Sequence, residues 1–137
     1  MRLKTVIGLA LAALLVTSVV ANAHFTIKIG SRPGGNVASH LMIARQWHTL
    51  GIGVRLTGSQ YSAAAMQVIL FKKLGGDVCA RKGIRLYLHQ PTLFGHRIPD
   101  YRRFLKQMMG GIDLGPLPLR TWKIVDPKKY GIRTCKV

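Results

Sequence analysis

The sequence predicts an α/β fold with largely parallel strand pairing, and two observations carry this prediction. Short segments that alternate apolar and polar residues, as half-buried strands do, recur between segments whose apolar residues lie three and four positions apart, as in helices. The two kinds of segment follow one another along the chain, and glycine or proline separates them. Because the strands are separated by helical segments, we expect a parallel sheet with helices packed against it.

The first half of this pattern contains two predicted strands and two predicted helices. Residues 25–29 alternate and lead into a glycine-rich turn, so they predict a strand. A helix is expected over 36–50, with Asn36 as its N-cap and Gly51 as its stop. Residues 54–57 predict a short strand. Residues 62–74 are almost wholly apolar and begin near three alanines, which indicates a buried helix.

The second half predicts two further strands and one further helix. Residues 84–88 alternate again and lead into His89, and a nearby proline ends the strand. After a loop, Pro99 is expected in the first turn of a helix, which Tyr101, Phe104, Leu105 and Met108 mark and Gly110-Gly111 terminates. Residues 114–119 contain two prolines, which predicts irregular structure. The last residues, 132–137, form the final predicted strand.

The N-terminal residues have the organisation of a secretory signal peptide. Arg2 and Lys4 precede an uncharged apolar run over residues 6–20, and Ala21-Asn22-Ala23 has the small-x-small form of a cleavage site. An uncleaved anchor is the alternative, but the run is shorter than the roughly 20 residues that span a bilayer. We therefore expect a signal peptide over 1–23 and an exported, periplasmic or secreted single domain over 24–137.

The charge of the chain is strongly positive. It contains 21 lysines and arginines but only 4 acidic residues, all aspartate, which gives a formal net charge of +17. Such a charge attracts nucleic acid, anionic lipid or acidic glycan, although a solvated surface of one sign is the simpler interpretation. Cys79 and Cys135 form either a disulfide, which an oxidising compartment would favour, or two free thiols. Their spacing fits no zinc or redox pattern, so we expect neither a metal nor another cofactor.

Three sites carry candidate chemistry, although each also has an ordinary explanation. The Gly34-Gly35 pair is a turn, Ser62 is in the position of a helix N-cap, and His89 ends a strand. Serine becomes a nucleophile only when a neighbouring base removes its proton, and histidine is the side chain whose pKa lies nearest neutrality. One catalytic site that contains all three would explain why each is present.

The three sites occur in motifs that resemble those of the proteolytic subunit of the Clp protease, a member of the crotonase-like superfamily. The order and approximate spacing of the motifs also agree with that family. The matching segments are Ser31-Arg32-Pro33-Gly34-Gly35-Asn36-Val37, in which Arg32 is a one-residue insertion, Gly58-Ser59-Gln60-Tyr61-Ser62-Ala63-Ala64-Ala65, Leu86-Tyr87-Leu88-His89-Gln90-Pro91, and Tyr130-Gly131-Ile132.

The resemblance implies a compact, truncated ClpP/crotonase-like fold of ββα units, and a serine peptidase activity on unfolded or short peptides. By match to the family, Ser62 is the nucleophile and His89 its base. The backbone N–H groups of Gly35 and Ala63 form the oxyanion hole, where the dipole of the helix after Ser62 adds positive potential. An ATPase partner is not expected outside the cytoplasm.

The sequence also departs from the family pattern. Residues 118–122 contain no carboxylate where the family has the third member of its catalytic triad, although Asp113 and Asp126 flank the region. The interval from His89 to Tyr130 is shorter than in the family. We therefore do not expect assembly into rings, although a homo-oligomer of another kind is an alternative.

Two alternatives follow. The first is an inactive basic binding protein for an anionic polymer or a membrane surface. The second, favoured less, is copper binding by His24 as a mature N-terminus.

Overall fold

The structure is a computed structural model of the chain, and it describes residues 25–136. The described part contains three α-helices, nine short strands and one 3-10 helix. The helices are α2 (Val37–Thr49), α3 (Ala63–Lys73) and α4 (Tyr101–Met108), and the 3-10 helix is η1 (Pro127–Tyr130). The strands are β1 (Phe25–Ile29), β2 (Ile52–Leu56), β3 (Gln60–Tyr61), β4 (Val78–Ala80), β5 (Leu86–Leu88), β6 (Thr92–Leu93), β7 (His96–Arg97), β8 (Lys123–Val125) and β9 (Arg133–Thr134).

The strands form two sheets and a hairpin. The first sheet has the order β1-β2-β4-β9 and is parallel throughout. The second sheet has the order β3-β5-β8, in which β3 and β5 are parallel and β8 is antiparallel to β5. Strands β6 and β7 pair as a separate antiparallel hairpin. The chain passes from the first sheet to the second after β2 and again after β4, so consecutive strands contribute to both sheets.

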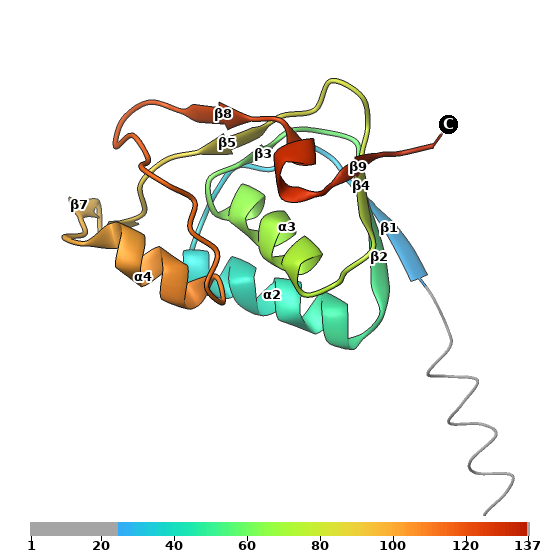
Figure 1. The fold of residues 1–137 in the computed structure, drawn as a ribbon, viewed down its shortest axis with the longest axis horizontal. Coiled ribbons are helices and arrows are strands. Elements are labelled where there is room, and N and C mark those ends of the chain that lie inside the picture. The colour runs from blue at the N-terminus through green and yellow to red at the C-terminus, as the bar shows by residue number, and fades with distance from the viewer. Residues whose placement is uncertain (1–24, 137) are drawn as a thin grey trace, which may run out of the picture.

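Helix α3 lies at the centre of the molecule. In Figure 1 it runs between the second sheet above and α2 below, while the first sheet stands beside both helices. Its residues from Ala63 to Phe71 are all buried, and α2 buries Leu41 and Ala44. The alanines that open α3 let the neighbouring backbones approach closely, because their side chains add little volume. An almost wholly apolar sequence therefore folds as the buried helix that was expected.

The main elements lie close to their predicted positions. Helix α2 begins after Asn36, whose side chain accepts a hydrogen bond of 2.9 Å from the Ser39 N–H, and Gly51 follows the helix with φ +67°. The predicted first-turn position of Pro99 is wrong. Asp100 occupies the N-cap of α4, so the proline precedes the helix.

Several short strands were not predicted. Strands β3, β4 and β8 have two or three residues, too few to display an alternating pattern, and the loop after residue 91 contains the hairpin of β6 and β7. The final strand is also shorter than expected, since β9 covers two residues of the predicted 132–137. Pairing is parallel in the first sheet but mixed in the second, because β8 returns antiparallel to β5.

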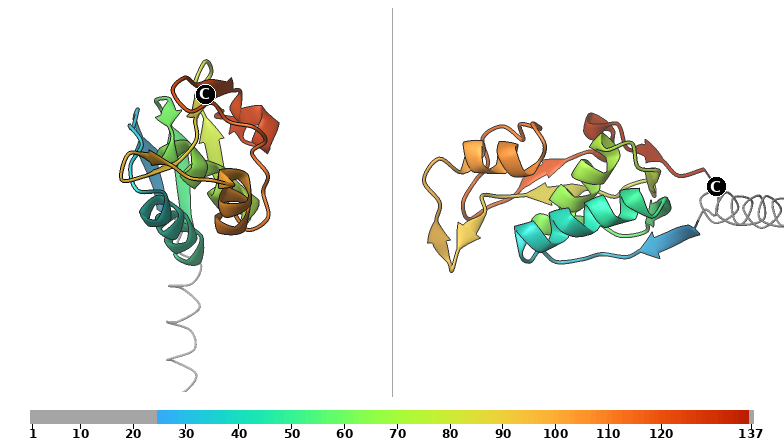
Figure 2. Two further views of the ribbon diagram at one scale, coloured as in Figure 1. Left: turned by 90° about the vertical axis from the view of Figure 1, so that its left-hand side faces the viewer. Right: turned by 90° about the horizontal axis from the view of Figure 1, so that it is seen from below.

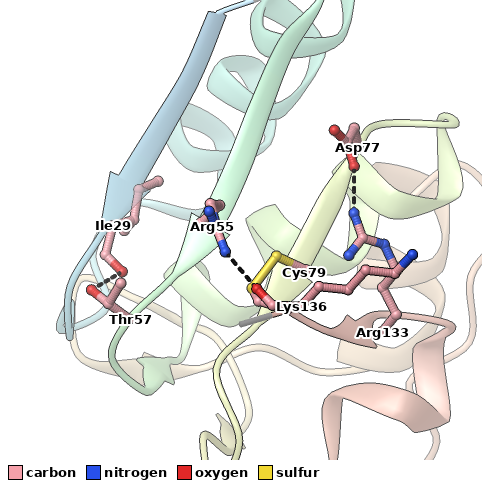
Figure 3. Close-up of a disulfide and its surroundings, with 8 residues drawn as sticks. Ile29, Arg55, Thr57, Asp77, Cys79, Arg133 and Lys136 are labelled. Atoms are coloured by element: carbon pink, nitrogen blue, oxygen red, sulfur yellow. Dashed lines mark hydrogen bonds and ion pairs between the residues drawn. A yellow bond between two sulfur atoms is a disulfide. The ribbon is translucent and has the colours of Figure 1, made fainter.

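A disulfide joins Cys79 of β4 to Cys135, which follows β9, and their Cα atoms lie 4.8 Å apart. The bond attaches the C-terminal residues to the outer side of the first sheet, as Figure 3 shows. Within residues 25–136, no helix is both long and apolar enough to cross a membrane. The predicted signal peptide over 1–23, and His24, lie outside the described residues.

Candidate active site

Ser62 occupies a sharp turn between β3 and the buried helix α3. Its backbone has φ +55° and ψ −123°, a conformation that glycine adopts easily and that strains other residues. Its N–H donates a hydrogen bond of 2.7 Å to the Tyr87 carbonyl of β5, which holds the turn in place. The Ser62 hydroxyl makes no capping hydrogen bond to α3. The ordinary role of an N-cap therefore does not account for this serine.

The glycine loop packs directly against Ser62. A Cβ atom at Gly34 would lie 2.5 Å from the Ser62 Cβ and 2.9 Å from its Oγ, distances at which the atoms overlap. Glycine is thus required at this position for the loop to approach the serine. A Cβ at Gly35 would lie 3.2 Å from the His40 Nε2 of α2, so the following residue is also closely confined.

Arg32, the insertion in the first motif, fixes this loop to the body of the protein. Its backbone bridges β3, donating to the Ser59 carbonyl at 3.3 Å and accepting from the Tyr61 N–H at 3.2 Å. Its Nε donates to the Gln60 Oε1 at 2.7 Å, and its Nη1 donates to the Gln67 Oε1 at 3.1 Å. The arginine therefore links the loop to β3 and to the interior of α3.

The polar network around Arg32 is partly buried. Gln67 is fully buried within α3, and its Oε1 also accepts a hydrogen bond of 2.6 Å from the His40 Nδ1. Burial lowers the pKa of Arg32 from its ordinary value. This network could not be predicted from the sequence, because Gln67 belongs to an apolar helical segment and its partners are distant in the chain.

His89 directly follows β5, and its ring is oriented by a backbone group. The ring Nδ1 lies 2.6 Å from the Gln90 carbonyl oxygen. A carbonyl oxygen only accepts hydrogen bonds, so Nδ1 is the donor, and in the neutral ring the lone pair is on Nε2. Trp122 also packs against the His89 ring, with the centroids 4.7 Å apart. Gln90 in turn donates from its side chain to the Leu117 carbonyl at 2.9 Å, which anchors the loop.

Ser62 and His89 border the same cavity of about 270 Å³. Gly35 borders it as well, whereas Ala63 is the first residue of α3 and lies immediately after the serine. The remaining lining is mainly apolar and consists of Asn36, Val37, Ala38, Pro91, Thr92, Leu93, Ile98, Phe104 and Met108. The expected direct hydrogen bond is not present: within residues 25–136, the Ser62 hydroxyl and the His89 ring share the cavity without bonding to each other.

Neither flanking aspartate completes a triad. Asp113 accepts hydrogen bonds from the Gly115 N–H at 2.9 Å and from Arg102 at 3.1 Å, and these two contacts lower the pKa of its carboxyl. Asp126 accepts from the Lys128 N–H at 2.9 Å. In the described part of the chain, no carboxylate bonds to the His89 ring, and the Gln90 carbonyl takes that place.

An aromatic cluster lies on the second sheet next to this site. The rings of Tyr61 and Tyr87 stack with centroids 4.5 Å apart, and they occupy paired positions on β3 and β5. Trp122 meets the Tyr61 ring edge to face at 5.6 Å. Tyr61 and Tyr87 alternate along their strands with Gln60 and Leu86, which are fully buried. The cluster could not be predicted from the sequence, because its members come from three separate strands or loops.

Among the residues that the structure describes, no group of three His, Cys or Asp side chains could hold a metal ion. Comparison of the chain with protein-family models, with curated proteins and with solved structures finds no match to any of them. The resemblance to the Clp protease subunit therefore rests on the sequence motifs alone.

Proposed function

We propose that this protein is a serine hydrolase in which Ser62 is the nucleophile and His89 the general base. One observation carries the proposal. Ser62 has a strained backbone, with φ +55° and ψ −123°, at the N-terminus of a buried helix, and its hydroxyl does not cap that helix. Strained residues cost free energy and concentrate at functional sites. A serine on a sharp strand-to-helix turn is also the arrangement that exposes the nucleophile in other hydrolases.

In its neutral form, His89 would be the tautomer that a general base requires. The Gln90 carbonyl holds the proton on Nδ1, so Nε2 is free to accept the hydroxyl proton as Ser62 attacks a carbonyl carbon. A backbone carbonyl orients the ring but carries less negative charge than a carboxylate, so it stabilises the imidazolium less. We therefore expect a slow hydrolase. The proposal requires the Ser62 hydroxyl to approach Nε2 within the cavity that both residues line.

The oxyanion of the tetrahedral intermediate would be stabilised by the N–H groups of Gly35 and Ala63. The Ala63 N–H belongs to the first turn of α3, where it has no partner within the helix and where the helix dipole is positive. Close contact between the glycine loop and Ser62 places Gly35 at the same cavity. When the intermediate collapses, His89 Nε2 returns its proton to the leaving group, and a water molecule then releases the acyl enzyme.

The cavity indicates the class of substrate. Val37, Phe104 and Met108 contribute apolar surface beside the serine, which suits an apolar side chain of a peptide or a short acyl group. The site is open to solvent next to the β6–β7 hairpin, whose Thr92 and Leu93 also line it. An unfolded or short peptide is the substrate that we propose.

The passage of consecutive strands between two sheets supports a ClpP/crotonase-like fold of ββα units. Strands β2 and β3 precede α3, and strands β4 and β5 precede the hairpin and α4. Each unit thus supplies one strand to each sheet and then a helix. The signal peptide over residues 1–23 supports export, which intact-mass analysis would test by the presence of His24 at the N-terminus after expression in an exporting host.

A fluorophosphonate probe tests the proposed activity directly. It should label the purified protein at Ser62, as located by peptide mapping. Ser62→Ala should abolish labelling, and His89→Ala should slow it by roughly a hundredfold, the typical contribution of a general base. Ser39→Ala is the matched control, since Ser39 is exposed on α2, and it should label normally. Absence of labelling in the folded protein, or labelling that persists in Ser62→Ala, would refute the proposal.

A further inference from the structure

The outer face of the first sheet is uncovered and strongly basic. Val54, Leu56 and Val78 point inward to the core beneath the helices, so the residues that alternate with them point away. In Figures 1 and 2 the helices lie on the inner side of this sheet. The outer side and its rim carry six cationic residues, which we call the basic sheet face: Lys28, Arg55, Arg81, Lys82, Arg133 and Lys136.

The strand register places three of these cations in one row. Lys28 pairs with Arg55, Arg55 with Cys79, and Cys79 with Arg133, so the row crosses all four strands. Lys28 and Arg55 lie on adjacent strands about 4.8 Å apart, where their like charges repel each other, whereas Cys79 separates Arg55 from Arg133. A bound anion would remove the repulsion between Lys28 and Arg55. This pair therefore favours an anion more than two isolated cations would.

The basic sheet face is hollow. Two cavities, of about 440 Å³ and 310 Å³, lie next to each other, since Arg55 and Lys136 line both of them, and we call the pair the groove. No carboxylate lines the larger cavity. The described residues that line the smaller cavity include one carboxylate, Asp77, whose Oδ1 lies 3.3 Å from the Arg133 Nη2. The groove thus carries a large excess of positive charge.

The disulfide and one arginine hold the groove in shape. The bond between Cys79 and Cys135 fixes the C-terminal residues over β4. Arg55 donates a hydrogen bond of 3.0 Å to the Lys136 carbonyl, as Figure 3 shows. These contacts position Lys136 beside the groove before any ligand arrives, so less conformational entropy is lost on binding.

We propose that the basic sheet face binds an acidic polysaccharide through its carboxylate or sulfate groups. Two neighbouring cavities that share two cations can bind successive acidic groups of one linear chain, whereas a membrane presents its anionic headgroups in a plane. No aromatic residue lines either cavity, so the groove lacks the stacking platforms that bind single-stranded nucleic acid. Aliphatic lysine and arginine stems provide carbon surface for sugar rings, and their charged ends bind the acidic groups.

A charge-matched pair of triple variants tests the proposal with a heparin dodecasaccharide and the full chain. Lys28→Gln, Lys82→Gln and Lys136→Gln together remove three cations from the groove. Their side chains make no hydrogen bond or ion pair within residues 25–136, so the fold should persist. The control triple, Lys73→Gln, Lys106→Gln and Lys129→Gln, removes three exposed lysines elsewhere. Thermal melting and fluorophosphonate labelling of both triples check that the fold and the Ser62 site are intact.

In titration calorimetry at 0.1 M salt, the groove triple should bind the dodecasaccharide about tenfold more weakly, with a smaller salt dependence. The control triple should weaken binding less than about threefold, through net charge alone. Equal weakening in both triples would overturn the proposal, because it would show attraction by total charge only. Tighter binding to single-stranded DNA of equal charge, or to phosphatidylglycerol vesicles, would also overturn it by assigning the groove to another ligand. Loss of labelling at Ser62 would not affect this result, because the two sites share no residue.

Discussion

Replacement of Ser62 by glycine should stabilise the protein, although glycine usually destabilises a folded chain. The Ser62 backbone has φ +55° and ψ −123°, which costs about 1–3 kcal/mol for a residue with a Cβ atom. Glycine releases that strain, but it also makes the unfolded chain more flexible, and this cancels about 0.4–1 kcal/mol of the stabilisation. The hydroxyl makes no capping hydrogen bond, so its removal should cost little. We expect a net gain of about 1 kcal/mol in the free energy of unfolding.

Urea unfolding of the oxidised protein measures this effect. Ser62→Gly should raise the midpoint without a change in the slope m, and the melting temperature should rise by about 4 °C. Ser62→Ala keeps the Cβ atom and the strain, so its stability should match that of the wild type within about 0.5 kcal/mol. Ser39→Gly, in the first turn of α2, is the control and should destabilise by about 0.5–1 kcal/mol. If Ser62→Gly is no more stable than Ser62→Ala, the inference of backbone strain at the proposed nucleophile is wrong.

Two further predictions concern the glycine loop and the disulfide. Gly34→Ala should lower stability by about 1–3 kcal/mol and abolish fluorophosphonate labelling, because its Cβ would lie 2.5 Å from that of Ser62. Gly30→Ala, which meets no atom within 4 Å, should change neither property, and similar behaviour of the two variants would contradict the close contact. Reduction of the bond between Cys79 and Cys135, which are 56 residues apart, should cost about 4 kcal/mol on the chain-entropy model. Urea titration with and without reductant measures this loss, and an unchanged midpoint would contradict it.

The residues of the candidate site could be predicted from the sequence, but their geometry could not. The motifs around Gly35, Ser62 and His89 were recognised because each is a local run of residues, and the structure brings all three to one cavity. The backbone strain at Ser62 leaves no mark in the sequence, since serine before alanine is an ordinary N-cap pattern. The role of the Gln90 carbonyl was equally hidden, because any residue supplies a carbonyl and only its orientation makes it a partner of the histidine.

The sequence by itself determined the elements whose pattern extends over several residues. Strand β1, helix α2 with its Asn36 cap, the buried helix α3 and helix α4 follow from periodicity, capping and glycine, which act between near neighbours in the chain. It also determined the excess of positive charge.

Only the tertiary structure decided how distant residues meet. Strands of two or three residues, such as β3 and β8, form because a neighbouring strand satisfies their backbone groups, and this depends on the whole fold. The buried contacts of Arg32 with Gln67, and the row of cations across the first sheet, likewise require strand register. A sequence pattern reports which face a residue prefers, whereas register and packing fix which partner lies beside it.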